Sequence, residues 1–406
     1  MSKQLIVIGG GAAGFFCAVN AARLQPHLKV TILEKSNKLL SKVKVSGGGR
    51  CNVTHACFEI AEMAKKYPRG GHFVKKSFHR FFTTDTIKWF EERGVKLKTE
   101  ADARMFPVTD SSQTIIDCLM RETNKYGISI RLNKEVKAVN THNSQFIVQC
   151  LGGENISADF ICIACGGYPK PSMFDWLREL GHSIEEPVPS LFTFNIPNHR
   201  ITRLMGVSVE KAKVKVAHSK LADEGPLLIT HWGFSGPAIL RLSAWGAREL
   251  ATNNWQFAIV VNWLPEHNEQ SLQEKFRQVR FEIASTRMTT RNPFGLPQRL
   301  WEFLLEHSEI NSETRWADLP AKEQNRLVKN VCACEFAIKG KTTYKEEFVT
   351  AGGVVLSEVD PNTMMSKKNP NLYFAGEILD VDGITGGFNF QHAWTSGFIV
   401  ADSLKG

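Results

Sequence analysis

The sequence predicts an α/β protein whose main domain, a parallel sheet with helices, is assembled from both ends of the chain. An apolar strand, a glycine-rich turn, a helix and a second strand follow one another within the first 34 residues. Strands and helices punctuated by glycine return from Thr350 onward, whereas the residues between show antiparallel alternation and then helical periodicity. We therefore expect a discontinuous domain, about 1–187 and 339–406, and an inserted domain, about 188–338.

The composition is that of an ordinary globular protein. With 406 residues, the chain is longer than one hydrophobic core usually supports, which predicts two or three domains. Hydrophobic residues make up 43% and charged residues 22%, so core size is not limiting. The formal net charge is +9, but Lys and Arg are spread along the chain without a long basic block. This pattern favours small anionic ligands such as nucleotides and predicts no nucleic-acid partner.

Cysteine usage and hydropathy predict a cytoplasmic, soluble protein. The nine cysteines have no regular spacing, and no signal peptide precedes the first strand at Leu5. No apolar run reaches the roughly 18 residues that a membrane span needs, so we expect no membrane partner. Cys332-x-Cys334 has no second pair or nearby histidines at ligand spacing, so we expect no metal site. The oligomeric state is left open.

The first turn carries a dinucleotide-binding fingerprint. Gly9-x-Gly11-x-x-Gly14 joins the first strand to the first helix, with Ala12 and Ala13 at the helix start. Its glycines allow a tight turn, close approach of a pyrophosphate and close packing of helix on strand. Free N–H groups and the positive dipole end of the helix favour the same ligand. The segment thus predicts a Rossmann-type domain.

An acidic residue stands where such a domain binds the adenosine ribose. Glu34, followed by Lys35, ends the second strand, twenty residues past Gly14. Its carboxylate can accept hydrogen bonds from both ribose hydroxyls, and it disfavours a 2′-phosphate. NADP is therefore not expected at this site.

Two further segments favour FAD over NAD as the resident cofactor. An apolar strand ends at Ala164 and runs into Gly166-Gly167, which brings backbone close to a flat ligand. The strand Leu372–Ala375 leads into an acidic turn and then a glycine pair before the closing helix, which we expect over 387–404. In sequence order the three glycine-rich pieces resemble two-dinucleotide-binding-domain flavoproteins, in which the last helix points its N-terminus at the flavin pyrimidine ring.

A fourth segment narrows the resemblance. Lys42 to Thr54 reads Lys-Val-Lys-Val-Ser-Gly-Gly-Gly-Arg-Cys-Asn-Val-Thr and lies in a stretch, 40–55, that we expect to be a loop. Together with Thr230–Pro237 and Thr350–Val354, it resembles the HI0933-like FAD-dependent flavoprotein family nearly end to end. The resemblance implies a three-layer FAD-binding domain, an inserted β-barrel-like unit and a helical subdomain that shape a substrate cleft. Family members have been assigned reduction of activated double bonds in steroids or oxidation of small amino ketones.

These segments define the candidate cofactor site, with FAD expected to bind non-covalently. Its residues are Gly9, Gly11, Ala12, Ala13, Gly14, Glu34, Lys35, Lys42, Ser46, Gly48, Gly49, Arg50, Cys51, Asn52, Val136, Ala164, Gly166, Gly167, Gly376, Glu377, Asp380, Gly386, Gly387, Phe388 and Asn389. We expect the N–H groups and positive dipole end of the closing helix to face flavin N1 and O2. The glycine pair is needed at the start of that helix because a Cβ there would push the backbone away from the ring.

Three residues are candidates for catalysis. His231 and His392 are the histidines inside motif segments, and each could donate a proton near a flavin or be a hydrogen-bonded core histidine. Arg104 could bind an anionic substrate or a neighbouring carboxylate. Cys51 could be a redox thiol or a covalent anchor, but a small side chain packed against the cofactor is the favoured interpretation. Cys162-x-x-Cys165 lies in an apolar strand, where residues three apart point to opposite faces, so it predicts no redox pair.

The inserted domain shows its own patterns. Val207–Val216 alternates with Lys211, Lys213 and Lys215 on one face, which indicates a half-buried strand at a lysine-blunted sheet edge. A helix over 271–284 is expected to open with a capping box formed by Ser271 and Glu274.

The expected function is that of an FAD-dependent oxidoreductase. We favour an NAD(P)H-linked reductase of an activated double bond in a small organic substrate. Because the chain has no second strand–GxGxxG–helix unit, NAD(P)H would bind only transiently. A flavin oxidase of a small amine or amino ketone is one alternative. An RNA-modifying or RNA-binding flavoprotein, supported by the net charge, is another.

Overall fold

The computed structural model describes residues 3–142, 145–343 and 349–404, which form two compact units. The described residues up to Ser190, with those from Val349 onward, make the first unit, and Leu191–Thr343 make the second. The chain leaves the first unit once, after Ser190, and returns to it once, so the second unit is a single inserted segment.

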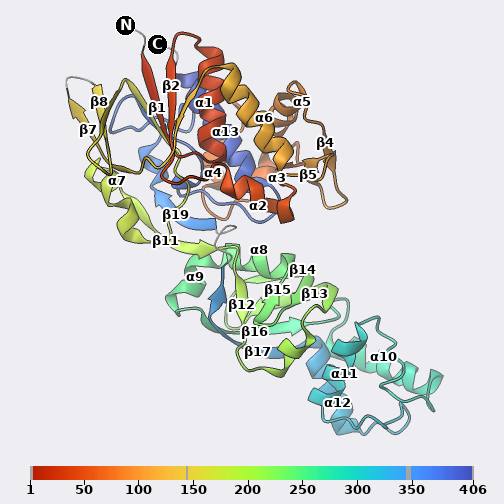
Figure 1. Ribbon diagram of the computed structural model, residues 1–406. Helices are drawn as coiled ribbons and strands as arrows, with labels where there is room; N and C mark the ends of the chain where they lie inside the picture. The colour runs from red at the N-terminus through yellow and green to blue at the C-terminus, as the bar shows by residue number, and fades with distance from the viewer. Residues whose placement is uncertain (1–2, 143–144, 344–348, 405–406) are drawn as a thin grey trace. The chain divides into compact units, whose positions relative to one another are not determined.

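The first unit is organised by a five-stranded parallel sheet in the order β20-β10-β1-β2-β6 (Figure 1). Three of its strands, β20, β10 and β1, are short, mostly apolar and almost fully buried, as is typical of a sheet covered on both faces. The five strands are β1 (Gln4–Ile8), β2 (Lys29–Leu33), β6 (Ser129–Arg131), β10 (Phe160–Ile163) and β20 (Leu372–Phe374).

Helices cover one face of this sheet and a small antiparallel sheet lies on the other side (Figure 1). α1 (Ala12–Leu24) packs against α13 (Phe388–Ser403) and α6 (Gln113–Lys125). The antiparallel sheet is β7-β8-β9, with β7 (Val136–His142), β8 (Gln145–Cys150) and β9 (Asn155–Ala158). The predicted three-layer α/β fold is confirmed.

Smaller elements complete the first unit. The expected loop over 40–55 is wrong in part, because α2 begins at Ser41 and a strand begins at Thr54. Helical geometry is lost at Ser46, where the glycine run turns the chain away from the helix. The other elements are β3 (Thr54–His55), β4 (Leu97–Thr99), β5 (Arg104–Pro107), β11 (Ile184–Ser190), β19 (Val349–Val354), α2 (Ser41–Gly49), α3 (Ile60–Ala64), α4 (Gly71–Ser77), α5 (Thr83–Glu91) and α7 (Asp175–Glu179).

The second unit contains a seven-stranded sheet in the order β17-β16-β13-β14-β15-β12-β18. The two outermost strands follow one another through Gly340, so the sheet curls toward closure as the β-barrel-like prediction requires. Its strands are β12 (Thr193–Asn195), β13 (Ser208–Val216), β14 (Ala222–Ile229), β15 (Gly233–Ser235), β16 (Gln256–Asn262), β17 (Cys334–Lys339) and β18 (Lys341–Thr342).

One predicted feature of this sheet is wrong. β13 is half-buried as expected, but it pairs with both β14 and β16 and is an interior strand. Lys213 and Lys215 therefore do not protect an edge; they stand on the solvent face of the sheet.

Helices of the second unit share one hydrophobic core with the sheet. The capping box of α10 is formed by Asn268 and Ser271, not by Ser271 and Glu274, because the helix begins at Glu269, two residues earlier than expected. No helix in the described ranges is both long enough and apolar enough to cross a membrane. The helices are α8 (Pro237–Trp245), α9 (Ala247–Thr252), α10 (Glu269–Glu282), α11 (Gln298–His307) and α12 (Ala321–Cys332).

Candidate functional site

Four strands of the parallel sheet end side by side, and the predicted cofactor segments follow directly from them. Backbone N–H groups step across this edge: Ala375 N donates to Ile163 O, Ala164 N to Ile8 O and Gly9 N to Leu33 O, at 2.8–3.0 Å. Parallel strands bring their carboxyl ends to one edge, and the strand order reverses direction at β1. Ligands of open α/β sheets bind at such a crevice.

The first turn is shaped by close backbone contacts. Gly9 has φ +118°, and a Cβ there would lie 2.4 Å from the Ala164 carbonyl oxygen. A Cβ on Gly14 would lie 2.0 Å from the Gly9 carbonyl oxygen, so helix and strand require this glycine. A Cβ on Gly11 would meet nothing within 4 Å. The N-terminal end of α1 at Gly11 therefore faces open space that a pyrophosphate can occupy.

Glu34 is held at the end of β2 beside this turn. Its Oε2 accepts the Gly10 N–H at 2.9 Å, and its Oε1 accepts the N–H and hydroxyl of Ser36 at 2.9 and 2.8 Å. A carboxylate has lone pairs left after these bonds, so Glu34 can still accept from a ribose. Lys134 N donates to Glu34 O at 2.8 Å, which brings the chain leading into Val136 to the same edge, while Lys35 is exposed.

The loop after α2 exposes backbone and buries its cysteine. Gly47, Gly48 and Gly49 all have positive φ, and a Cβ on Gly48 or Gly49 would meet nothing within 4 Å. Arg50 stacks on Phe106, with 4.0 Å between its guanidinium carbon and the ring centroid, and pairs with Glu100. Cys51 is fully buried, and burial raises the pKa of its thiol to about 12. A thiolate is thus strongly disfavoured there, consistent with a packing role.

Glu377 connects three of the cofactor segments. Its Oε2 lies 2.5 Å from Lys42 Nζ, and its Oε1 accepts the Thr350 N–H at 2.9 Å. A Cβ on Gly167 would lie 2.9 Å from the same Oε1. The glycine is therefore required by the packing of Glu377 and Thr350 against it.

The glycine pair before α13 packs against β3. A Cβ on Gly387, which has φ +93°, would lie 2.6 Å from the Thr54 carbonyl. With its amide nitrogen donating to Thr54 O, Asn52 accepts the Gly387 N–H on its oxygen; both distances are 2.9 Å. The Gly387 N–H is thus used within the chain, so the N–H groups available to a ligand are those of the first turn of α13, which begins at Phe388.

The rest of this loop is fixed by buried polar contacts. Asn389 accepts the Gly383 N–H at 2.8 Å and donates to the Gly383 carbonyl at 2.9 Å. The buried Tyr67 hydroxyl donates to Phe388 O at 2.6 Å. Asp382 is fully buried against Arg69, next to the buried Asp380; burial raises the pKa of Asp382 and Arg69 opposes that shift.

His392 lies inside the core of the first unit. Its Nε2 donates to Gly376 O at 3.3 Å, and Nδ1 has no hydrogen-bond partner among the described residues. Burial lowers the pKa of His392 to about 4, so the ring is neutral at pH 7. A neutral, solvent-excluded ring is poorly suited to proton donation.

The other two catalytic candidates have different surroundings. His231 is exposed in the second unit, with its ring 4.1 Å from that of Trp232. Arg104 pairs with Asp102 at 2.6 Å and with Glu100 at 3.2 Å. Of the two roles expected for Arg104, the structure thus shows binding to neighbouring carboxylates. Arg104 also lies opposite His55 in the β3–β5 pairing.

Sequence reasoning missed His55 and Tyr67. His55 follows directly after the Lys42–Thr54 segment, and its Nδ1 lies 3.0 Å from Gly386 O. Its adjacency to the motif was a usable signal. Tyr67 gave no such signal, because nothing in its local sequence indicates a partner 321 residues away.

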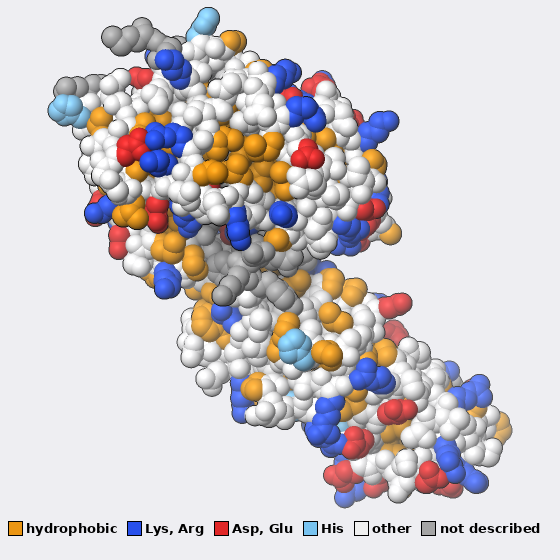
Figure 2. Space-filling view, in the orientation of Figure 1, with side chains coloured by type: hydrophobic (Ala, Val, Ile, Leu, Met, Phe, Trp, Pro, Cys, Tyr) orange, Lys and Arg blue, Asp and Glu red, His pale blue; other side chains and the backbone are white. Residues whose placement is uncertain are grey.

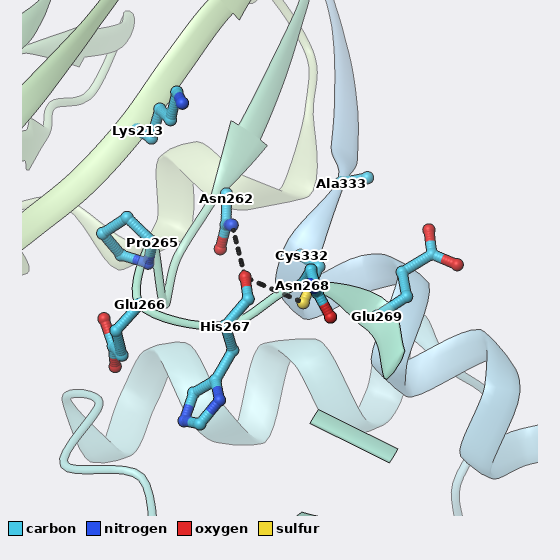
Figure 3. A pocket seen from close by; sticks show the side chains of 9 residues that line it. All are labelled: Lys213, Asn262, Pro265, Glu266, His267, Asn268, Glu269, Cys332 and Ala333. Atoms are coloured by element: carbon cyan, nitrogen blue, oxygen red, sulfur yellow. Dashed lines mark hydrogen bonds between the residues drawn. The ribbon is translucent and has the colours of Figure 1, made fainter. Parts of the chain in front are cut away.

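A hollow in the second unit is separate from these residues. It encloses about 410 Å³ between the end of β16, the start of α10 and the end of α12 (Figure 3). The His267 carbonyl accepts from Asn262, while its ring points away from Lys213 (Figure 3). None of the predicted site residues lines this hollow.

The fold and the edge site define a Rossmann-type dinucleotide-binding protein. The chain belongs to the HI0933-like family, because residues 3–403 match the profile described as "HI0933-like protein Rossmann domain". It is 30% identical to a ribosomal RNA dihydrouridine synthase of Haemophilus influenzae, over 99% of this chain and 98% of the relative. It is 27% identical to a 3-dehydro-bile acid delta(4,6)-reductase of Clostridium scindens, over 98% of each.

Solved flavoprotein structures share the fold. A 3-ketosteroid-delta4-(5alpha)-dehydrogenase of Rhodococcus jostii aligns with a TM-score of 0.51 and 12% identity, over 98% of this chain and 97% of that one. A flavocytochrome c3 fumarate reductase gives 0.51 and 17%, over 99% and 78%. These likenesses show the fold, and membership of the HI0933-like family makes the chain an FAD-dependent oxidoreductase.

The edge site fits FAD. Open space stands over Gly11, Gly48, Gly49 and Gly166, where a ligand can approach backbone closely. Glu34 has lone pairs for an adenosine ribose, and the N-terminal end of α1 suits a pyrophosphate. The first turn of α13 supplies N–H groups and a positive dipole end for the pyrimidine edge of a flavin.

Proposed function

We propose that the protein reduces a carbon–carbon double bond conjugated with a carbonyl, with NADH or NADPH as a transient donor. The observation that carries the proposal is that relatives with unlike substrates are named for reducing one type of bond. Dihydrouridine is uridine whose ring double bond, conjugated with a carbonyl, has been reduced. The delta(4,6) bonds of a 3-dehydro bile acid are conjugated with its ketone.

The site's own residues support direct reduction. Bound FAD supplies a hydride at N5 once it is reduced. The protonated, buried Cys51 thiol does not favour a disulfide relay. The positive end of α13 favours negative charge on the flavin, and Lys42 and Glu377 hold the two segments beside it together.

Uridine in ribosomal RNA is the first candidate substrate. It is favoured by the relative from Haemophilus influenzae and by a second ribosomal RNA dihydrouridine synthase, from Escherichia coli, 30% identical over 98% of this chain and 97% of the relative. The surface charge of the second unit adds little support for an RNA substrate. Figure 2 shows that basic side chains are interspersed with acidic ones over the region of α10, α11 and α12. A small steroid-like enone is the second candidate, favoured by the bile acid reductase.

The test is a two-step reaction under anaerobic conditions. The yellow holoprotein is mixed with NADH or NADPH until its flavin bleaches, and each candidate acceptor is then added separately. The acceptors are unmodified ribosomal RNA, a 3-oxo steroid with 4,6 double bonds, and buffer alone. We expect one acceptor to restore the colour and gain two hydrogens by mass spectrometry.

Other outcomes overturn the proposal. Colour restored by neither acceptor, together with bleaching by a small amine or amino ketone and reoxidation in air, identifies an oxidase. Acid precipitation of the same sample checks the cofactor: FAD in the supernatant is expected, and flavin retained in the pellet would indicate a covalent bond.

A further inference from the structure

His55 links β3 to the loop that precedes α13. Its Nδ1 lies 3.0 Å from the Gly386 carbonyl oxygen, and its ring lies 4.6 Å from that of Phe388 at an interplanar angle of 32°. Thr54, beside it, donates to Gln391 on α13 at 2.6 Å. The imidazole is therefore held against the segment that leads to the N-terminus of α13.

The hydrogen bond fixes which nitrogen of His55 titrates. A carbonyl oxygen only accepts, so Nδ1 must carry a hydrogen in both the neutral and the charged ring. Nε2 is left as the atom that gains or loses a proton, and no hydrogen bond of Nε2 occurs in the described part of the chain. The ring is half-buried, so solvent protons can reach it.

Burial and nearby cations together lower the pKa of His55. Burial lowers the pKa of His55 most, the Gly386 hydrogen bond raises it, and Lys66 lowers it. Asp102 raises this pKa and Arg104 lowers it, both from the β4–β5 hairpin. Nearby cations thus add to the cost of protonating the ring, unless a negative charge arrives beside it.

We infer that His55 is a positioning residue that holds the Gly386 carbonyl and takes up a proton when the flavin beside α13 gains negative charge. The resemblance to flavoproteins puts the flavin pyrimidine ring at the N-terminus of α13. Reduced flavin carries negative charge at that ring's N1–O2 edge. Coupling between two sites is reciprocal, so negative charge there raises the affinity of His55 for a proton, and that proton stabilises reduced flavin. The inference requires bound FAD and no particular substrate.

The test measures protons taken up as the flavin of the holoprotein is reduced. Dithionite-free photoreduction in weakly buffered solution, from pH 5 to 8, is followed with a pH indicator. Wild type is compared with two variants of His55. His55→Asn has an amide that can still donate to Gly386 O, and His55→Phe keeps an aromatic ring against Phe388. The control is His27→Asn, which changes an exposed histidine in the turn between α1 and β2. Within part of this range, we expect wild type and His27→Asn to take up as much as one proton per flavin more than the two His55 variants do. Both His55 variants should lose that uptake, and their reduction potential should depend less steeply on pH.

A second measurement, made on wild type, tests the inference even if the His55 variants lose FAD. The His55 ring resonances of wild type, assigned by through-bond NMR, are titrated in the oxidised and reduced holoprotein. The inference requires a pKa at least one unit higher in the reduced state. Identical pKa values, or unchanged proton uptake in His55→Asn, would overturn it and leave His55 as a structural link. Neither result depends on the substrate, so failure here is distinct from failure of the proposed reductase activity.

Discussion

Two glycine-rich segments of the FAD-binding unit meet at the carboxyl edge of the parallel sheet, and contacts of different range hold them. Gly9–Gly14 is bonded mainly within the first strand–helix–strand unit, where Glu34 accepts the Gly10 N–H across 24 positions. Gly383–Asn389 is bonded to His55 and Tyr67, across 331 and 321 positions.

The difference teaches which part of the site is autonomous. The first segment depends mostly on partners close in sequence, with Gly9 also packed against the Ala164 carbonyl. The second segment reaches its conformation only after β3 and the Tyr67 region have packed against α13. Changes in the first should therefore act on folding or on the adenosine end, and changes in the second on the flavin end.

The largest effect is expected at Gly14. Gly14→Ala puts a Cβ 2.0 Å from the Gly9 carbonyl oxygen, so helix and strand must separate, at about 3 kcal/mol or more of unfolding free energy. Gly11→Ala is the matched control, since a Cβ there meets nothing within 4 Å. It should leave the apoprotein's denaturation midpoint unchanged and weaken FAD binding. Equal destabilisation of the apoprotein by both variants would contradict the geometry of this turn.

His392 should make stability depend on pH. Its folded pKa of about 4 lies below the unfolded value, so between pH 6.5 and 4 the unfolded chain binds more protons and stability falls as pH falls. The expected loss is about 3 kcal/mol at pH 4. Urea denaturation of wild type and His392→Asn over this range measures it. The variant should show a shallower slope, and parallel curves would show that His392 does not remain neutral in the folded state.

Glu34→Ala should separate the adenosine end from the flavin end. FAD affinity should fall by roughly ten- to a hundredfold, about 1.5–3 kcal/mol for charge-assisted hydrogen bonds, while FMN, which lacks adenosine, is bound as before. Fluorescence titration of the apoprotein with both flavins is the measurement. Equal losses for FAD and FMN would instead assign Glu34 to holding Gly10 and Ser36 in the fold.

Tyr67→Phe should give the smallest effect. It removes the hydroxyl that donates to Phe388 O at 2.6 Å, a loss of about 0.5–1.5 kcal/mol for one hydrogen bond. Hydrogen exchange should increase at residues 383–390 and not at residues 9–14. Tyr126→Phe, at the C-terminal end of α6, is the control. Faster exchange in both segments would show that the first segment depends on the second.

Much of the FAD-binding unit was predictable because its signals are periodic or local. Apolar strands, the Gly9–Gly14 turn and Glu34 at the end of β2 follow from patterns spanning at most 34 residues. The predictions failed where pairing partners decide: β13 has the alternation of an edge strand but lies between β14 and β16. Lysines on a solvent face look the same in sequence whether the strand has one neighbour or two.

The glycine pair at Gly386-Gly387 shows the boundary most clearly. Its position before the last helix was readable from the residues, because glycine tolerates the positive φ that a tight helix entry needs. The reason why glycine is required at Gly387 could not be predicted from the sequence. The missing Cβ of Gly387 makes room for the Thr54 carbonyl, and Asn52 accepts the hydrogen bond of its N–H. Local sequence fixes backbone preferences within a few residues, whereas hydrogen bonds to distant partners exist only once packing has brought those partners together.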